Sequence, residues 1–245
     1  MKTIHSKNIV TLFFTIVSFL GFSQNQEAIF FTKSNTFFST YVHNGKVAYQ
    51  AIKNEPTSLN ELIQAMESIK IPVSNANSYR AFWINAYNLT VIKAIVSKYP
   101  VKSPLDITGF FDKKKHLIAS EKLTLNTIEN NKLRKLFKND PRFHFALVCA
   151  GLGCPPLISE AYLPKTIEQQ LTVQAKKAIN NNNFIKLNAK NKKVSVSQLF
   201  KWYASDFTQN KQSIIDFLNT YRIQKIPTTY SVSYYEYNWN LNKIN

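Results

Sequence analysis

The segment at residues 78–98 most constrains how this chain of 245 residues can fold. Its spacing predicts one helix, and Pro100 just beyond it is typical of a helix end. At 100° per residue, one side carries an apolar stripe that includes Phe82, and the other side carries Trp83 and Tyr87. A helix that is apolar nearly all round has to be buried. The rest of the chain must therefore pack around this helix, at the centre of a domain.

Two amides interrupt the apolar stripe of this helix, Asn85 and Asn88. A buried amide without a partner costs about 1–3 kcal/mol, so each side chain must be hydrogen-bonded. The partner is either backbone from a neighbouring loop or a ligand. On the second alternative, Asn85 is a candidate orienting or oxyanion-binding group, and Asn88 and Tyr87 are candidate ligand contacts.

Residues 1–23 have the pattern of a signal peptide. Two lysines precede an apolar run at 9–20, and small residues follow it up to Ser23, where we expect cleavage. The run is too short to cross a bilayer comfortably, and no cysteine lies near the cleavage site to accept a lipid. We therefore expect a periplasmic or secreted protein with no stable membrane span after signal removal; an uncleaved anchor is the alternative.

The chain is strongly basic, with a formal charge of +17 that falls to +15 once the two lysines of the leader are removed. Such a charge favours loose association with polyanions, including nucleic acid, anionic lipid and wall polymers, but it does not indicate a fold or a reaction. The lysines concentrate in turns such as 113–115 and 190–193, without the interleaved aromatics of an RNA-binding sheet. We interpret them mainly as solvated surface.

Residues 24–245 predict a single α+β domain, with helices packed on a small, mostly antiparallel sheet. About 220 residues can bury roughly 70% of their unfolded surface, and no linker divides them. Besides the central helix, we expect helices at 26–41, 57–69, 166–179, 197–203 and 213–221, and a short one capped by Asn126 or Thr127 that runs to 138. We expect hairpins of 116–119 with 122–125 and of 184–187 with 194–196, a buried strand at 143–149, and a last strand at 230–239.

Both cysteines of the chain, Cys149 and Cys154, follow that predicted buried strand. A thiol nucleophile needs a base within hydrogen-bond distance. On a strand, His144 would lie about 17 Å from Cys149 and point to the opposite face. Although His144 belongs to the same segment, the base is then expected to be His116 or His43, brought close by tertiary folding.

The alternative for the two cysteines is a disulfide, since an even number of cysteines in an oxidising compartment is readily paired across a turn. A closed bridge would remove both thiols from catalysis unless it were itself redox-active. A metal site is not expected, because the sequence has no H-x-x-H and no paired C-x-x-C. No cofactor is indicated either.

Four separated motifs give the chain a resemblance to domain-of-unknown-function family 547. They are Phe82–Asn88, Asp140–Cys149, Gly153–Leu157 with Glu160–Tyr162, and Phe200–Phe207. The resemblance extends from about Val42 to Trp239. It implies the family's fold, for which a distant likeness to papain-like peptidases has been proposed, and it implies no established activity. The chain departs from the family pattern at Gly151-Leu152 and near Tyr237-Asn238-Trp239.

Four further polar residues are candidates to line a cleft: Glu160, Tyr162, Tyr203 and Asp206. Tyr203 and Asp206 are three residues apart, on one face of a predicted helix. Each of the four is also a plausible cap or surface partner.

Two functions of different class remain. The first is a secreted thiol-dependent hydrolase of peptide or amide bonds, with Cys154 or Cys149 as nucleophile. The second is a non-catalytic ligand-binding or scaffolding domain, with a peptide or a cell-wall-related molecule as its partner and a structural Cys149–Cys154 disulfide. The redox state of the two cysteines discriminates between them.

Overall fold

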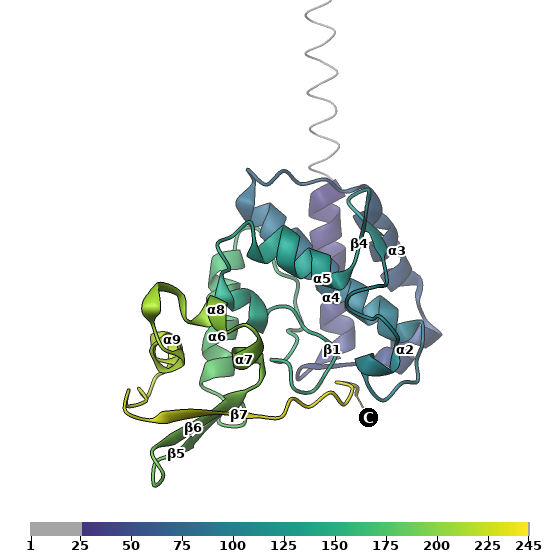
Figure 1. The fold of residues 1–245 in the computed structure, drawn as a ribbon. Helices are drawn as coiled ribbons and strands as arrows, with labels where there is room; N and C mark the ends of the chain where they lie inside the picture. Colours follow the sequence, from purple (N-terminus) through teal and green to yellow (C-terminus); the bar gives the residue numbers. More distant parts are fainter. Residues whose placement is uncertain (1–25, 245) are drawn as a thin grey trace, which may run out of the picture.

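The computed structural model describes residues 26–244. The predicted signal peptide lies outside these residues. Within them, the α+β class is confirmed, because helices and short strands follow one another throughout (Figure 1).

The α-helices of the described chain comprise one at residues 26–41 and eight labelled ones: α2 (Tyr49–Asn54), α3 (Thr57–Ser68), α4 (Ala76–Val96), α5 (Leu125–Thr127), α6 (Ile167–Ile179), α7 (Leu199–Trp202), α8 (Ala204–Phe207) and α9 (Ile214–Tyr221). Tighter or wider helical turns complete the set: η1 (Pro104–Asp106), the π-helix η2 (Ile128–Arg134), η3 (Pro141–Phe145) and η4 (Gln209–Lys211).

The strands form three small sheets and not one. Two are antiparallel hairpins, β1 (Val42–His43) with β2 (Lys46–Val47) and β3 (His116–Ile118) with β4 (Glu121–Leu123). In the third, β6 (Lys193–Ser197) pairs antiparallel with β5 (Ile185–Asn188) and parallel with β7 (Ser231–Tyr235). Both hairpins predicted from the sequence are present. The described strand pairs are mostly antiparallel, as expected.

Helix α4 is the central helix that the sequence predicts. From Ser78 to Val96 all its side chains are buried except that of Lys93. It contacts α2, α3, α6 and η2, so other elements cover it on several sides. This is why its hydrophobic residues need not be confined to one stripe.

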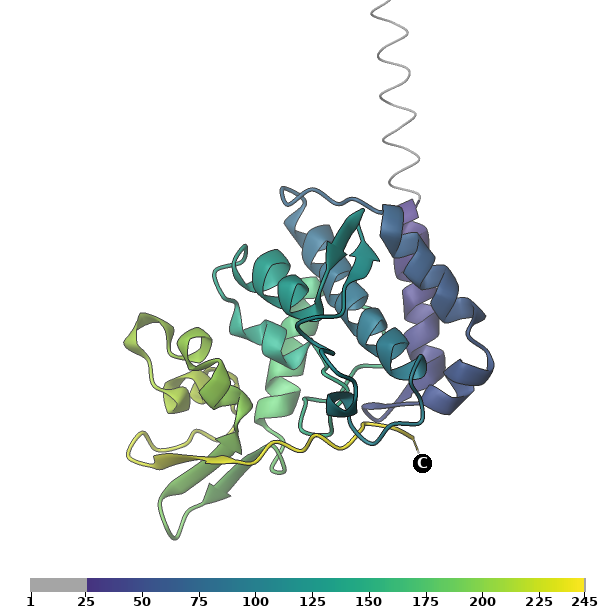
Figure 2. The same ribbon diagram turned by 45° about the vertical axis from the view of Figure 1, so that its right-hand side comes forward.

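The described residues form two hydrophobic clusters. The larger one surrounds α4 and includes the helix at 26–41, α3 and the β3–β4 hairpin. The smaller one joins the three-stranded sheet to α7, α8, α9 and the end of α6. Figures 1 and 2 show the smaller part, in green and yellow, beside the larger helical part.

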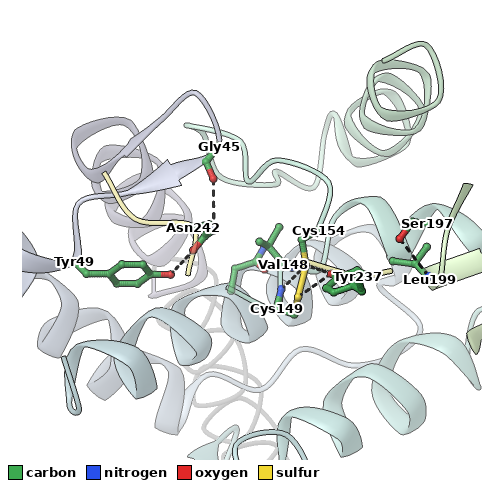
Figure 3. Close-up of a disulfide and its surroundings, with 10 residues drawn as sticks. Gly45, Tyr49, Val148, Cys149, Cys154, Ser197, Leu199, Tyr237 and Asn242 are labelled. Carbon is green, nitrogen blue, oxygen red and sulfur yellow. Dashed lines mark hydrogen bonds between the residues drawn. A yellow bond between two sulfur atoms is a disulfide. The ribbon is translucent and has the colours of Figure 1, made fainter. Parts of the chain in front are cut away.

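The end of the chain links these two parts. After β7, residues 236–244 run back across the molecule to the β1–β2 hairpin (Figures 1 and 2). The Leu241 amide donates to Lys102 O at 2.8 Å, and the Asn242 amide donates to Ala150 O at 2.9 Å. The Asn242 side chain accepts from the Tyr49 hydroxyl at 2.7 Å (Figure 3).

The predicted buried strand at 143–149 is wrong. Residues Pro141–Phe145 form the 3₁₀ helix η3, and an irregular segment continues to the cysteines. Asp140 caps this turn by accepting from the Arg142 amide at 3.0 Å, and Pro141 follows the cap. Both features favour a helical start. The apolar run is indeed buried, but an apolar run of this length does not distinguish a strand from a buried helical turn.

The predicted short helix after the β3–β4 hairpin is present but begins earlier. Thr124, and not Asn126 or Thr127, caps it, through its hydroxyl and the Thr127 amide at 3.1 Å. After one turn the helix widens into the π-helix η2. Short π segments of this kind are frequent at functional sites.

Candidate functional site

A cavity of about 310 Å³ lies between the two hydrophobic clusters. Its lining residues come from both clusters and are Tyr87, Phe111, Asn126, Glu129, His144, Leu147, Cys149, Cys154, Leu199, Trp202, Tyr203 and Trp239. Residues far apart in the sequence, from α4 to the final segment, therefore meet at one place.

His144 is a deeply enclosed polar group of this cavity, with 3% of its surface exposed. Its Nε2 atom lies 2.8 Å from Asp206 Oδ2. The Tyr203 ring packs against the imidazole, with 4.0 Å between ring centroids, and Phe207 lies on another side. These contacts hold the ring in one orientation. Tyr203 lies at the break between α7 and α8, and Asp206 lies in α8, so they are not on one continuous helix. Both nevertheless contact the same histidine.

Asp206 also binds Arg134 through two hydrogen bonds, from Nε at 2.6 Å and from Nη2 at 2.8 Å. Burial raises the pKa of the Asp206 carboxyl, but the hydrogen bonds and charges of His144 and Arg134 outweigh it and lower the pKa to about 2. Asp206 is therefore a carboxylate at neutral pH, and its oxygens already accept N–H groups from both partners.

Glu129 supplies a second carboxylate on the other side of His144. Its Oε1 lies 3.9 Å from His144 Nδ1, beyond hydrogen-bond distance. Burial, together with the charge and a hydrogen bond of Glu129, raises the pKa of the Tyr203 hydroxyl above its ordinary value. The tyrosine therefore stays protonated and can donate to Glu129.

The π-helix explains why Glu129 and Arg134 serve the same site. They are five residues apart, which on an α-helix would turn them about 140° away from each other. In a π-helix, residues i and i+5 are hydrogen-bonded neighbours. The widened turn Ile128–Arg134 thus directs the carboxylate of Glu129 toward His144 and the guanidinium of Arg134 toward Asp206.

Cys149 and Cys154 form a disulfide in the wall of the cavity (Figure 3). The Tyr237 hydroxyl lies 2.9 Å from Cys154 Sγ and 3.0 Å from Cys149 Sγ. The chain has two cysteines, both within the described residues, so neither thiol is free. Of the two alternatives that the sequence leaves open for this pair, the structure contains the disulfide.

Aromatic side chains form the rim of the cavity. The Trp202 and Trp239 rings stack with 6.0 Å between centroids and 24° between planes. Tyr237 and Phe111 pack against Trp239, at 4.7 Å and 6.1 Å. Trp202 is 49% exposed, so this aromatic rim is open to solvent on one side.

Residues 73–179 match a family model whose description is protein of unknown function, DUF547. This region belongs to DUF547. The resemblance drawn from the motifs is thereby confirmed, and three of the four motifs lie inside the matched residues. Among curated proteins none matches the chain, and none of the solved structures does. The papain-like likeness thus stays a prediction.

The DUF547 region supplies most of the cavity, including Glu129, His144 and both cysteines. The opposing wall, with Trp202, Tyr203 and Trp239, comes from the chain that follows it. The site therefore needs both parts of the domain.

The side chains of Asn85 and Asn88 on α4 are not among the residues that line the cavity. Both bond to backbone of a neighbouring loop, which is the first of the two alternatives that the sequence left open. Asn85 donates to Tyr162 O at 2.7 Å and accepts from the Tyr162 amide at 3.0 Å. Asn88 donates to Ala146 O at 3.0 Å and accepts from the Val148 amide at 2.9 Å. Both groups of each amide are used. Asn88 thus holds the loop between His144 and the cysteines against α4.

The strand that was expected to hold His144 away from Cys149 is absent, because η3 replaces it. His144, Cys149 and Cys154 line one cavity. His116 and His43, the alternative bases, are not among its lining residues. His43 lies on β1, and its Nε2 is 3.1 Å from Thr40 O. Burial and the charge of Lys114 lower the pKa of His116, on β3.

Two other predicted residues also lie elsewhere. Glu160 is exposed and accepts from Gln170 Nε2 at 3.3 Å. Tyr162 is buried, and its backbone binds Asn85. Of the predicted site residues, the cavity gathers Tyr87, His144, Tyr203, Cys149 and Cys154 on its lining, with Asp206 directly behind His144.

Sequence reasoning missed Glu129, Arg134 and the aromatic rim. Trp202 lies inside the motif Phe200–Phe207, and Tyr237 and Trp239 lie where the chain departs from the family pattern. The sequence therefore contained a reason to consider these three aromatic residues. Glu129 and Arg134 are ordinary charged residues of a polar helix. Only the π-helical turn singles them out, and the sequence does not show it.

Within residues 26–244, no three side chains of His, Cys, Asp or Glu are grouped to hold a metal ion. In the same residues, no helix is long and apolar enough to cross a membrane.

Proposed function

We propose that this domain binds a small ligand, such as part of a peptide or of a cell-wall fragment, in the cavity between its two clusters. One observation carries the proposal: segments spread over about 150 residues, including the motif residues, converge on a single cavity.

The composition of the cavity supports the same proposal. Ligand sites are mainly apolar and aromatic, with a few fixed polar groups. Here aromatic rings supply the walls, while Glu129, Asn126 and His144 supply the polar groups. His144 is held in place before any ligand arrives, because Asp206 and Tyr203 restrain it. Such preorganisation reduces the entropy lost on binding.

The disulfide favours a binding role over thiol catalysis. A thiol hydrolase needs a thiolate, and both sulfurs are bonded to each other. In a binding domain, the disulfide would form part of the cavity wall and would fix the conformation of the turn between Cys149 and Cys154.

The first test counts thiols and then measures binding. Unfolded, non-reduced mature protein should show no free thiol with a thiol reagent; two free thiols would contradict the structural role of the bridge.

Binding is followed by tryptophan fluorescence, since Trp202 and Trp239 border the cavity. The ligands tested are a panel of short peptides and N-acetylglucosamine-containing wall fragments. Trp202→Ala should weaken any saturable signal, whereas Ile223→Ala, at a residue 87% exposed, should leave it unchanged. No binding by any panel member would argue against the proposal.

A second candidate function is favoured by one observation, that His144 and both cysteines share the cavity. If a dithiol reduces the bridge, each sulfur gains a proton, and His144 becomes an available base for a thiol nucleophile. We expect an electrophilic peptide-like probe to label only reduced protein if this function is real. Labelling should be lost in Cys154→Ala if Cys154 is the nucleophile. Equal failure to label before and after reduction would exclude it.

We also propose that the protein is exported. The support is the apolar run at 9–20 and the small residues before Gln24. Terminal sequencing of protein from the native cell should find Gln24 first, and an N-terminal Met1 would contradict cleavage.

A further inference from the structure

We propose that the ligand of this cavity carries a positively charged group, such as an ammonium or a guanidinium, which is seated against Glu129 inside the aromatic walls. This inference rests on the proposed function and specifies its ligand class.

The first support is the distribution of charge. The chain has 31 lysines and arginines and 14 acids. Yet, of the described residues that line the cavity, none is Lys or Arg, and Glu129 is the single carboxylate. The nearby cation Arg134 is already committed to Asp206. The cavity therefore has a negatively charged lining in a basic protein, and this charge disfavours an anionic ligand.

The second support is the unused capacity of Glu129. A carboxylate accepts about four hydrogen bonds. The protonated Tyr203 hydroxyl can supply one. His144, the one basic side chain within 4.0 Å of Glu129 in the described chain, is too distant for another. Asp206 differs, because Arg134 and His144 together give it three N–H contacts. Of the two carboxylates beside His144, Glu129 is the one left to meet a ligand.

The third support is the cost of filling the cavity. Any ligand that fits displaces water from Glu129, and burying a carboxylate without a partner is strongly unfavourable. An apolar ligand would incur that cost in full. A cationic group offsets it by pairing with the carboxylate.

The fourth support is the nature of the walls. Tyr87, Phe111, Trp202, Tyr203 and Trp239 line the same space. The faces of such rings attract organic cations, by about 0.5–2 kcal/mol for each well-placed pair. The molecule already contains such a pair, since the Arg134 guanidinium lies 5.0 Å from the Tyr203 ring centroid.

The test compares choline with 3,3-dimethyl-1-butanol, its neutral isostere in which carbon replaces nitrogen, by tryptophan fluorescence and calorimetry on the mature protein. A second matched pair is N-acetyl-lysine methylamide and N-acetyl-norleucine methylamide. In at least one pair we expect the cation to bind about tenfold tighter or more. This comparison uses unaltered protein and does not depend on a variant folding.

The variant arm uses Glu129→Gln, which keeps the shape and removes the charge. It should weaken the cation about tenfold and leave the neutral partner unchanged. Glu160→Gln, at an exposed residue outside the cavity, is the matched control and should bind like the natural protein.

The outcomes separate the two proposals. Equal or tighter binding of the neutral probes, or binding of anionic members of the panel alone, overturns the cationic ligand while the cavity remains a binding site. Failure of these probes and of the whole panel overturns both.

Discussion

His144 Nε2 lies 2.8 Å from Asp206 Oδ2, and this contact joins two segments 62 residues apart at the wall of the cavity. Arg134 binds the same carboxylate from the π-helix. The negative charge of this buried carboxylate is compensated by Arg134 and His144, so removing any one of the three leaves a buried group without its partner.

Asp206→Asn should destabilise the protein by about 3–5 kcal/mol, because it leaves Arg134 without its counter-ion in a largely buried site. Urea unfolding followed by circular dichroism measures the change. Asp112→Asn, at an exposed carboxylate, is the control and should change stability by less than about 0.5 kcal/mol. Similar small effects in both variants would show that the ion pair contributes little.

The same carboxylate should make stability depend on pH in acid. Its pKa is about 2 in the folded protein and 3.8 ordinarily, so the ionised form is stabilised by folding. The contribution is fully present above pH 3.8 and is lost as the pH falls toward 2. The difference in unfolding free energy between the natural protein and Asp206→Asn should therefore shrink across this window. A constant difference would contradict the lowered pKa.

Asn88→Ala should destabilise the protein by about 2–4 kcal/mol, because it leaves the Ala146 carbonyl and the Val148 amide without their partner. It should also loosen the loop that bears His144, which amide hydrogen exchange at residues 146–149 would report. Asn182→Ala, in an exposed turn, serves as the control and should be nearly neutral. Unchanged exchange at the loop would mean that the amide does not hold it.

Replacing both Cys149 and Cys154 by Ala should lower stability by about 2 kcal/mol, because the bridge closes only a short loop. The change in unfolding free energy is measured under non-reducing conditions. The natural protein should lose a similar amount in a reducing buffer, and the double variant should not respond to it. A reducing buffer without effect on the natural protein would show that the bridge does not stabilise it.

Gly153→Ala should cost about 1–3 kcal/mol through overpacking, because its new methyl group would lie 2.8 Å from both the Asn238 amide nitrogen and Tyr237 Cδ1. Those neighbours belong to the segment that borders the cavity, so the tryptophan fluorescence should shift as well. Gly151→Ala is the matched comparison, since its nearest neighbour would lie at 3.2 Å, and it should cost less. A larger effect at Gly151 would contradict this packing.

Local patterns predicted much of the secondary structure. The all-round apolar character of residues 78–98 indicated a central helix, and α4 is that helix. The hairpin at β3–β4 and the amphipathic helix α6 also follow from short-range periodicity and turn residues. These features depend on neighbours within a few residues, which a single sequence displays directly.

The segment at 141–149 shows where local patterns fail. Its apolar residues predicted burial correctly and the backbone shape wrongly, since a buried strand and a buried helical turn need the same side chains. The expected distance of about 17 Å between His144 and Cys149 depended on that strand, which is absent. A cap at Asp140 and Pro141 decided the conformation, and the sequence contained that signal.

The sequence by itself determined the central helix, the α+β class, the family resemblance and a list of reactive residues. The tertiary structure alone decided which of those residues meet: His144, Tyr203 and the cysteines at the cavity with Asp206 behind, and Asn85, Tyr162, Glu160 and His116 elsewhere. It also added Glu129 and Arg134, through a π-helical turn. The physical reason is that helices and turns follow from contacts within a few residues, whereas the cavity is formed by the packing of two clusters whose residues are separated by most of the chain.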